Sequence, residues 1–315
     1  MQLSKELKSG TYRHDEYNRF YVRDPKFRSI HKATVRDRIV HQAIYSALCP
    51  LFDRQFFFDS YSCRLGKGTQ AAISRIWDFL RQESKSFSRE VYVFHGDVAN
   101  FFGSVDHQIL LSLIRRQVKD PQYIRLCRTI INSFSGEAGS GSAGDVSPRL
   151  RGSDSRSGGR GIPLGNLTSQ VFANIYLHEF DYFMKQVCDI RCYARYNDDF
   201  YIVSANKNHL IEVSQKAKDF LRTRLHLTLP DEKIIIRSLS QGVDMLGAVA
   251  FPYGLVPRIR LRRASLAVAG DAASQGYQSL VGKQLASYIG LLAQLKSYNL
   301  REKLRLSLGL NTDYV

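Results

Sequence analysis

Arg195-Tyr196-Asn197-Asp198-Asp199-Phe200 lies between residues 191–194, which include Tyr193, and residues 201–204, in which three of the four residues are aromatic or β-branched. Such flanks favour β-strands, and Asn-Asp-Asp is typical of a tight turn. The stretch therefore predicts a β-hairpin with carboxylates at its tip. Adjacent carboxylates repel each other unless water or a cation offsets the charge, so a solvated turn and a metal site are both open interpretations of this stretch alone.

A second predicted strand also ends in a carboxylate. Residues 91–95 form an apolar run of strand type that leads to Asp97, and Phe102 follows five positions later. If this strand lies beside the hairpin, Asp97 and Asp198 converge. Their hard oxygen ligands suit a pair of Mg²⁺ ions, with Mn²⁺ as the alternative, which would activate an attacking 3′-hydroxyl and stabilise a leaving pyrophosphate.

The charge of the chain points to a polyanionic partner. Its 315 residues carry 45 Lys and Arg against 29 Asp and Glu, a net charge of +16. Nucleic acid is the leading candidate for that partner. A membrane surface would also attract the charge, but the sequence has neither an apolar run of membrane-spanning length nor a signal-peptide core. We therefore expect a cytoplasmic protein with no membrane partner.

Taken together, these motifs resemble those of the reverse transcriptases, whose signature is a Tyr-x-Asp-Asp hairpin, an upstream strand-end Asp and an aromatic residue five positions after it. Residues 196–199, Asp97 and Phe102 match this signature. The resemblance implies an α+β right-hand polymerase fold of bacterial, archaeal or phage origin. Fingers and the start of the palm would span 1–96, the palm 97–255 with a flexible Gly/Ser/Arg-rich insertion at about 135–160, and a short helical thumb 256–315.

The resemblance also implies the reaction and its catalytic residues. The chain would add deoxynucleotides to a 3′ end on an RNA template, with Asp97, Val98 and Asp198 holding two Mg²⁺ ions and Asp199 supporting the site. Family members carry a lysine near the leaving pyrophosphate, which makes Lys233 a candidate general acid. A surface lysine at a strand start is the alternative interpretation of Lys233.

A further set of residues is assigned to the incoming dNTP. Lys26 and Arg28 lie two positions apart in a predicted strand, so their side chains would share one side and grip a triphosphate, unless the segment is only a solvated surface. The resemblance places Phe102 under the sugar. It places Leu164 and Gly165 against the incoming nucleotide.

The template RNA and the cDNA or primer are assigned to polar and basic residues spread along the chain. Glycines beside Arg64 and Lys67 allow an anion-binding loop just before a helix, and Thr69, Thr168 and Asn208 are predicted helix caps. The complete set of predicted nucleic-acid contacts is Arg64, Lys67, Asn166, Ser169, Gln170, Tyr196, Gly247 in a hairpin like the primer grip, Arg258 and Arg260.

One departure from the common pattern narrows the resemblance. Most reverse transcriptases have Gln before the second glycine of the motif at 161–165 and Ser-Pro at the start of the next helix, whereas this chain has Leu164 and Ser169-Gln170. This departure resembles the enzymes of diversity-generating retroelements, which implies errors at template adenines and a small basic accessory protein as partner. The alternatives are a group II intron-like, retron or phage-defence reverse transcriptase, or a non-catalytic RNA-binding scaffold.

Overall fold

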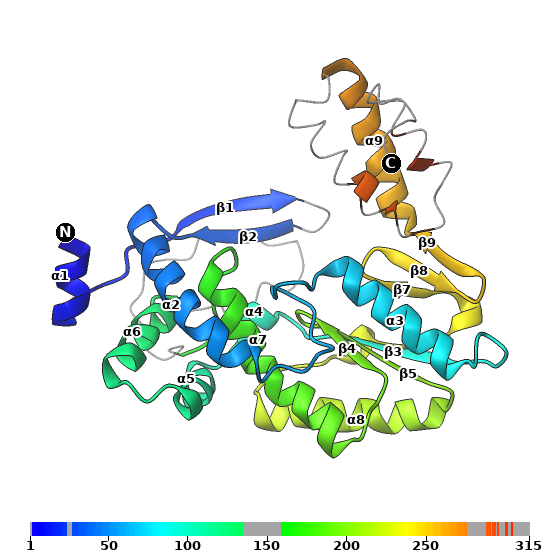
Figure 1. Cartoon of the computed structure of the whole chain (residues 1–315), viewed down its shortest axis with the longest axis horizontal. Helices are drawn as coiled ribbons and strands as arrows, with labels where there is room; N and C mark the ends of the chain where they lie inside the picture. The colour runs from blue at the N-terminus through cyan, green and yellow to red at the C-terminus, as the bar shows by residue number, and fades with distance from the viewer. Residues whose placement is uncertain are drawn as a thin grey trace.

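The structure, a computed structural model, describes residues 2–23, 27–134, 159–275, 288–290, 292, 293, 295, 300, 301 and 304 (Figure 1). Its described helices are α1 (Gln2–Ser9), α2 (Val35–Asp53), α3 (Thr69–Glu83), α4 (Phe101–Ser104), α5 (His107–Gln117), α6 (Pro121–Asn132), α7 (Leu167–Tyr182), α8 (Lys207–Arg224) and α9 (Ile259–Gln275). Its described strands are β1 (Asn18–Arg23), β2 (Phe27–Lys32), β3 (Tyr92–Asp97), β4 (Tyr193–Tyr196), β5 (Asp199–Ser204), β6 (Ile234–Ser238), β7 (Val243–Met245), β8 (Ala248–Phe251) and β9 (Gly254–Pro257).

A four-stranded antiparallel sheet, in the order β4-β5-β3-β6, forms the centre of the molecule. Side chains alternate between the two faces of a strand, so neighbouring residues enter different cores. Phe94 and Phe200 lie in the larger core with α7 and α8, whereas Val93 and Tyr201 lie in the second core with α3. Figure 1 accordingly shows α3 and α8 on opposite faces of this sheet.

The two central strands come together at a glycine. Gly96 of β3 is the ladder partner of Phe200 in β5. A Cβ added to Gly96 would lie 2.3 Å from Cζ of that ring, which no side chain can accept. The Phe200 ring therefore lies directly over the backbone of Gly96, and the missing side chain allows β3 and β5 to pair closely at this end.

Helices α5 and α6 both begin at an aspartate cap. Asp106 accepts hydrogen bonds from two backbone N–H groups at the start of α5, and Asp120 does the same for α6, whose first residue is Pro121. An acidic cap followed by proline is a favourable helix start, because both satisfy or remove orphan N–H groups.

Three predicted caps are wrong. Asn206, not Asn208, caps α8 through a bond from the His209 N–H. Thr69 is the first residue of α3, and its hydroxyl donates to Tyr196 instead. Thr168 lies within α7, where its hydroxyl is 2.6 Å from Nδ1 of His41, a buried ring whose pKa desolvation lowers to about 4. The hydroxyl groups of both threonines form tertiary hydrogen bonds instead of capping a helix.

α7 is followed directly by a π-helix, Phe183–Val187. Beyond the central sheet, β7, β8 and β9 form a separate three-stranded antiparallel sheet that leads into α9. The predicted insertion at about 135–160 lies outside the described residues except at Gly159 and Arg160, and so does most of the predicted thumb after α9. Among the described residues, no helix has both the length and the apolar character needed to cross a bilayer.

Candidate active site

The three predicted carboxylates lie together at one end of the central strands. Asp97 is the last residue of β3 and Asp199 the first of β5, and the two are direct partners in the antiparallel ladder. Directly opposed side chains share one face of a sheet, so both carboxylates face the same way. Asp198 lies in the two-residue turn before β5, in which Asn197 has a φ of 53° that asparagine tolerates. The carbonyl of Asp198 accepts a hydrogen bond from Val98 N at 3.4 Å.

The charges of this cluster perturb Asp198. Burial of its carboxyl group, together with the negative charges of Asp199 and Asp97, raises the pKa of Asp198 from 3.8 to about 6, against the opposing effect of the Lys233 ammonium. The carboxylate is thus held in a site where a cation would be favourable. That is the electrostatic condition of a metal site.

Lys233 reaches two of the predicted metal ligands from the 3₁₀ turn Asp231–Lys233. Its Nζ lies 2.8 Å from Oδ2 of Asp97 and 3.4 Å from the carbonyl oxygen of Val98. These two oxygens therefore already share a cation, and hard oxygen donors are what Mg²⁺ prefers. In the described part of the chain no three His, Cys, Asp or Glu side chains form a metal cluster by themselves. The Val98 carbonyl and ligands from substrate or water would have to complete a coordination shell.

His95 is a neighbour of the carboxylates that the sequence did not reveal. Its Nε2 lies 2.9 Å from Oδ1 of Asp199, and its ring stacks on Tyr201 with centroids 4.6 Å apart. All three residues lie on the face that carries Asp97. His95 therefore fixes the position of Asp199. The available signal was its place two residues before Asp97, which puts both side chains on one face of a strand.

A buried ion pair supports the hairpin that carries Asp198. Arg195 is 1% exposed, and its Nε and Nη2 each lie 2.7 Å from an oxygen of Asp181 in α7. The Tyr193 hydroxyl donates to the same carboxylate at 2.6 Å. The remaining Nη1 of Arg195 donates to the carbonyl of Asn197 at 2.9 Å, one residue before Asp198. The guanidinium thus ties the catalytic turn to a core helix.

The loop before α3 holds the same turn from the other side. Asn174 of α7 donates to the Ser62 carbonyl at 2.9 Å, and the Ser62 hydroxyl bonds to the Asn197 side chain. Arg195 Nη2 also donates to the hydroxyl of Ser60 at 3.0 Å. The turn is therefore bound from both the helix and the loop, which fixes the Asp198 backbone before any ligand arrives.

Arg64 and Lys67 belong to this loop and are largely engaged within the protein. The Arg64 guanidinium contacts Asp53 Oδ1 at 2.6 Å and donates to three backbone carbonyls. Lys67 donates to the Phe58 carbonyl at 2.8 Å and lies over the Phe58 ring, and burial lowers its pKa. Both residues shape the loop, and their contact with nucleic acid stays a prediction.

The motif at Leu164 and Gly165 packs on the β1–β2 hairpin. The Leu164 carbonyl accepts from His31 N at 3.0 Å. Gly165 has a φ of 106°, and a Cβ there would lie 2.7 Å from Cγ2 of Ile30, so only glycine fits. Arg28 is exposed on β2 in this hairpin, and Lys26 lies outside the described residues. The structure therefore brings Arg28 and the Leu164 motif onto neighbouring elements.

Phe102 belongs to the short helix α4, which follows β3. It is half-buried, and its ring packs edge-on against Phe101 at 5.3 Å. The carbonyl of Phe102 accepts from Ile162 N at 2.7 Å, in the segment that leads to Leu164. The two predicted nucleotide contacts, Phe102 and Leu164, are thus connected through the backbone.

The start of α7 is held by residues predicted to touch nucleic acid. Asn166 donates to the His31 carbonyl at 2.6 Å and accepts from Ala33 N at 3.2 Å, so it joins α7 to the end of β2. Ser169 is buried and donates to the Pro163 carbonyl at 2.6 Å, while Gln170 is exposed. Asn166 and Ser169 therefore shape the motif, and Gln170 is free to contact a ligand.

The predicted primer-grip hairpin is the β7–β8 turn. Leu246 and Gly247 both have positive φ, 48° and 96°, as a two-residue turn of type I′ requires. Arg258 donates from its backbone to the Gly247 carbonyl at 3.0 Å and pairs with Asp244 at 2.7 Å. Arg260 falls in α9, and its side chain lies outside what the structure describes.

Comparison with known proteins assigns the family of this chain. The family model described as reverse transcriptase (RNA-dependent DNA polymerase) matches residues 22–250. Protein YkfC of Escherichia coli (strain K12) is 25% identical over 279 residues, which cover 78% of this chain and 69% of YkfC. The group II intron-encoded protein LtrA of Lactococcus lactis subsp. cremoris is 22% identical over 311 residues, which cover 78% of this chain and 48% of LtrA.

Solved structures with a similar fold include two yeast telomerases. Apo telomerase from Candida tropicalis has a TM-score of 0.56 at 10% identity and covers 95% of this chain and 57% of its own. Telomerase from Candida albicans, in complex with a TWJ fragment of telomeric RNA, has a TM-score of 0.55 at 11% identity and covers 99% and 61%. The chain thus spans about half of LtrA and about three fifths of these telomerases. The predicted right-hand polymerase fold is confirmed.

Proposed function

The chain belongs to the reverse transcriptase (RNA-dependent DNA polymerase) family, and on that premise we propose that it adds deoxynucleotides to a 3′ end on an RNA template. The observation that carries the proposal is the convergence of Asp97, Asp198 and Asp199 at one end of β3 and β5. A non-catalytic scaffold has no physical need for three converging carboxylates, in which burial, and then the charges of Asp199 and Asp97, raise the pKa of Asp198 to about 6.

In this proposal Asp97, Val98 and Asp198 hold two Mg²⁺ ions, with Mn²⁺ as the alternative. Bound there, the ions would activate the 3′-hydroxyl and stabilise the leaving pyrophosphate. The residues of the chain do the rest. Asp199, which lies 2.9 Å from His95, would add negative charge beside the metal ligands and so favour cation binding. Arg195 fixes the position of the turn by donating a hydrogen bond to the Asn197 carbonyl.

Lys233 is the proposed proton donor to the leaving group. Its ammonium contacts Asp97 and the Val98 carbonyl, so the proton that it would donate lies beside the oxygens that would hold the metal ions. Phe102 would support the sugar, and Lys26 with Arg28 would hold the triphosphate. The boundaries of fingers, palm and thumb at residues 96 and 255 stay predictions.

The test uses Asp97→Asn and Asp198→Asn in Mg²⁺-dependent extension of a DNA primer on an RNA template. We expect both variants to lose DNA synthesis and to keep RNA binding, because the carboxylates position metal and do not grip the template. Asp219→Asn is the matched control, since that carboxylate is exposed on α8 with a side-chain exposure of 57%. Near-normal extension by either active-site variant would refute the two-metal assignment.

At a finer level we propose that the chain is the reverse transcriptase of a diversity-generating retroelement, error-prone at template adenines. Leu164 supports this, because an apolar side chain stands where most family members present Gln beside the nucleotide. Leucine offers contact area without a directed hydrogen bond, so one source of discrimination between bases is missing. A pair of near-identical repeats that differ at adenines, close to the gene, would support this assignment. Intron boundaries or a retron RNA there would refute it.

The partners in this proposal are template RNA, cDNA or primer, and dNTPs. A small basic accessory protein is a further proposed partner that rests on the resemblance alone. The second candidate function, a group II intron-like reverse transcriptase, is favoured by the likeness to LtrA. It shares the chemistry of the site, so only the template and the fidelity would separate the two.

A further inference from the structure

Two packed helices far from the carboxylates carry only positive charge. α5 and α6, which pack against each other, contain Arg115, Arg116, Arg125 and Arg128 and no Asp or Glu. The acid nearest to α6 in sequence, Asp120, already accepts two backbone N–H groups as its cap. The surface of these two helices is therefore strongly basic, and the negative charge beside it is the exposed Asp120 carboxylate, which lines the same hollow as Arg125.

Three of the four arginines have no acid partner among the described residues. Arg116 pairs with Glu179 at 2.7 Å. Arg115, Arg125 and Arg128 are exposed, and none of them forms an ion pair within the described part of the chain. We call these three residues the α6 basic face. Unpaired arginines that repel one another are stabilised when an anion binds between them.

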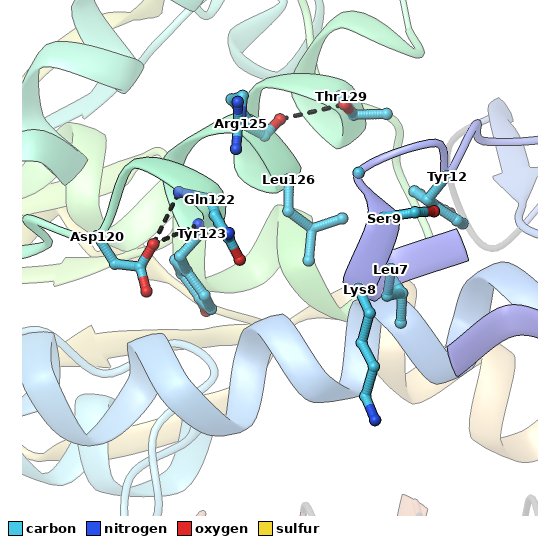
Figure 2. Close-up of a pocket in the computed structure, with 11 residues that line it drawn as sticks. Leu7, Lys8, Ser9, Tyr12, Asp120, Gln122, Tyr123, Arg125, Leu126 and Thr129 are labelled. Atoms are coloured by element: carbon cyan, nitrogen blue, oxygen red, sulfur yellow. Dashed lines mark hydrogen bonds between the residues drawn. The ribbon is translucent and has the colours of Figure 1, made fainter. Parts of the chain in front are cut away.

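Hollows on both sides of α6 bring further hydrogen-bond donors to this face. Arg115 and Arg128 line a hollow of about 610 Å³ between α5 and α6, together with Gln108 and Asn132. Arg125 lines a second hollow, of about 380 Å³, between α1 and α6. Figure 2 shows this second hollow, with Leu126 pointing across it toward α1. Arg125 and Arg128 of α6 therefore border hollows on opposite sides of that helix, and Arg115 of α5 borders the same hollow as Arg128.

We propose that the α6 basic face binds the sugar-phosphate backbone of RNA, without reading its sequence, and so anchors the template at a second place; this rests on the proposed function. Guanidinium groups bind phosphate through paired N–H donors, and glutamine and asparagine add donors for the same oxygens. Among the described residues, no large exposed apolar side chain lies on α1, α5 or α6. An apolar anchor for a protein or membrane partner is therefore missing.

The position of α6 separates this face from the catalytic carboxylates. Tyr123 of α6 donates to the Ile44 carbonyl of α2 at 2.8 Å, so α6 packs on the outer side of α2. Figure 1 shows α1 and α6 at the end of the molecule opposite α3 and β8. RNA bound here would leave the site at Asp97 and Asp198 accessible.

The experiment compares the variant Arg115→Gln/Arg125→Gln/Arg128→Gln with a matched control, Lys216→Gln/Arg222→Gln/Arg224→Gln, on the exposed side of α8. Both lower the net charge by three. Binding of a labelled RNA hairpin and of a single-stranded oligouridine is measured from roughly 50 to 200 mM salt. Three lost phosphate contacts should reduce the slope of log affinity against log salt by about 2 to 3, so the wild type should lose about 20- to 40-fold more affinity across that range than the variant.

The control should keep the wild-type slope with both RNAs. Equal losses in the two variants, or an unchanged slope in the α6 variant, would overturn the proposal. A second measurement uses the wild type alone: crosslinks from 4-thiouridine RNA should map to α5 and α6, and crosslinks confined to other elements would contradict it. Extension of a short primer-template by the α6 variant should stay at the wild-type rate. If the wild type extends no primer but keeps this arginine-dependent binding, the polymerase proposal fails while the RNA-binding face stands.

Discussion

Removing the buried guanidinium of Arg195 should separate what it does for stability from what it does for catalysis. Arg195→Leu leaves the Asp181 carboxylate buried without its ion-pair partner, and breaking one side of a buried pair costs about 3–5 kcal/mol. In a chain of this size we expect the melting temperature to fall by about 6–10 °C, at roughly 2 °C per kcal/mol. Asp181→Leu should lose a similar amount, because it strands the guanidinium.

The double variant Arg195→Leu/Asp181→Leu distinguishes the two roles. Replacing a whole buried ion pair by apolar residues is often neutral or stabilising, so most of the lost stability should return. Catalysis should not return, because the Asn197 carbonyl next to Asp198 still lacks the Nη1 donor that held it at 2.9 Å. A displacement of a catalytic group by about 1 Å costs about a hundredfold in rate.

The assay is single-turnover dNTP addition on an RNA template, with melting measured on the same preparations. We expect kcat of the double variant to fall about a hundredfold, with a nearly unchanged KM for the dNTP. Tyr193→Phe is the control: it removes one hydrogen bond to Asp181 and leaves Arg195 in place, so it should cost about 1 kcal/mol and no activity. A stable double variant with near-wild-type kcat would refute the positioning role of Arg195.

Three other outcomes follow from the site. Because the folded-state pKa of Asp198 is raised to about 6, its ionisation destabilises the metal-free protein as pH rises from about 4 through 6. In chelator, Asp198→Asn should therefore melt higher than the wild type at pH 7.5 and equally at pH 4, and the same difference at both pH values would contradict the raised pKa. Phe102→Ala should admit ribonucleotides, because its ring is expected where a ribose 2′-hydroxyl would fit; unchanged discrimination in single-nucleotide addition would move the gate to Phe101. Leu164→Gln should misincorporate about ten- to a hundredfold less often opposite template adenines when products copied from a defined RNA are sequenced, and identical error spectra would leave Leu164 without a role in fidelity.

Local chemistry let the sequence predict the catalytic hairpin. Strand-forming residues and an Asn-Asp turn favour a hairpin locally, so Asp198 at its tip and Asp97 at a strand end were predictable. The family model that matches residues 22–250 confirms the resemblance to the reverse transcriptases. The Asp106 cap of α5 is likewise local, because its side chain accepts from backbone N–H groups in the first turn of its own helix.

Tertiary structure decided everything that joins residues distant in the chain. The register that sets Asp97 opposite Asp199 depends on Phe200 crossing Gly96. His95 and Asp199 meet across 104 positions, and Asn166 reaches the end of β2 across 135. No local propensity encodes such pairs, because each forms only when the packing of two cores has already brought its strands and helices together. The sequence alone was therefore enough to predict which groups would do the chemistry, whereas the packing of the cores selects the neighbours that hold those groups in place.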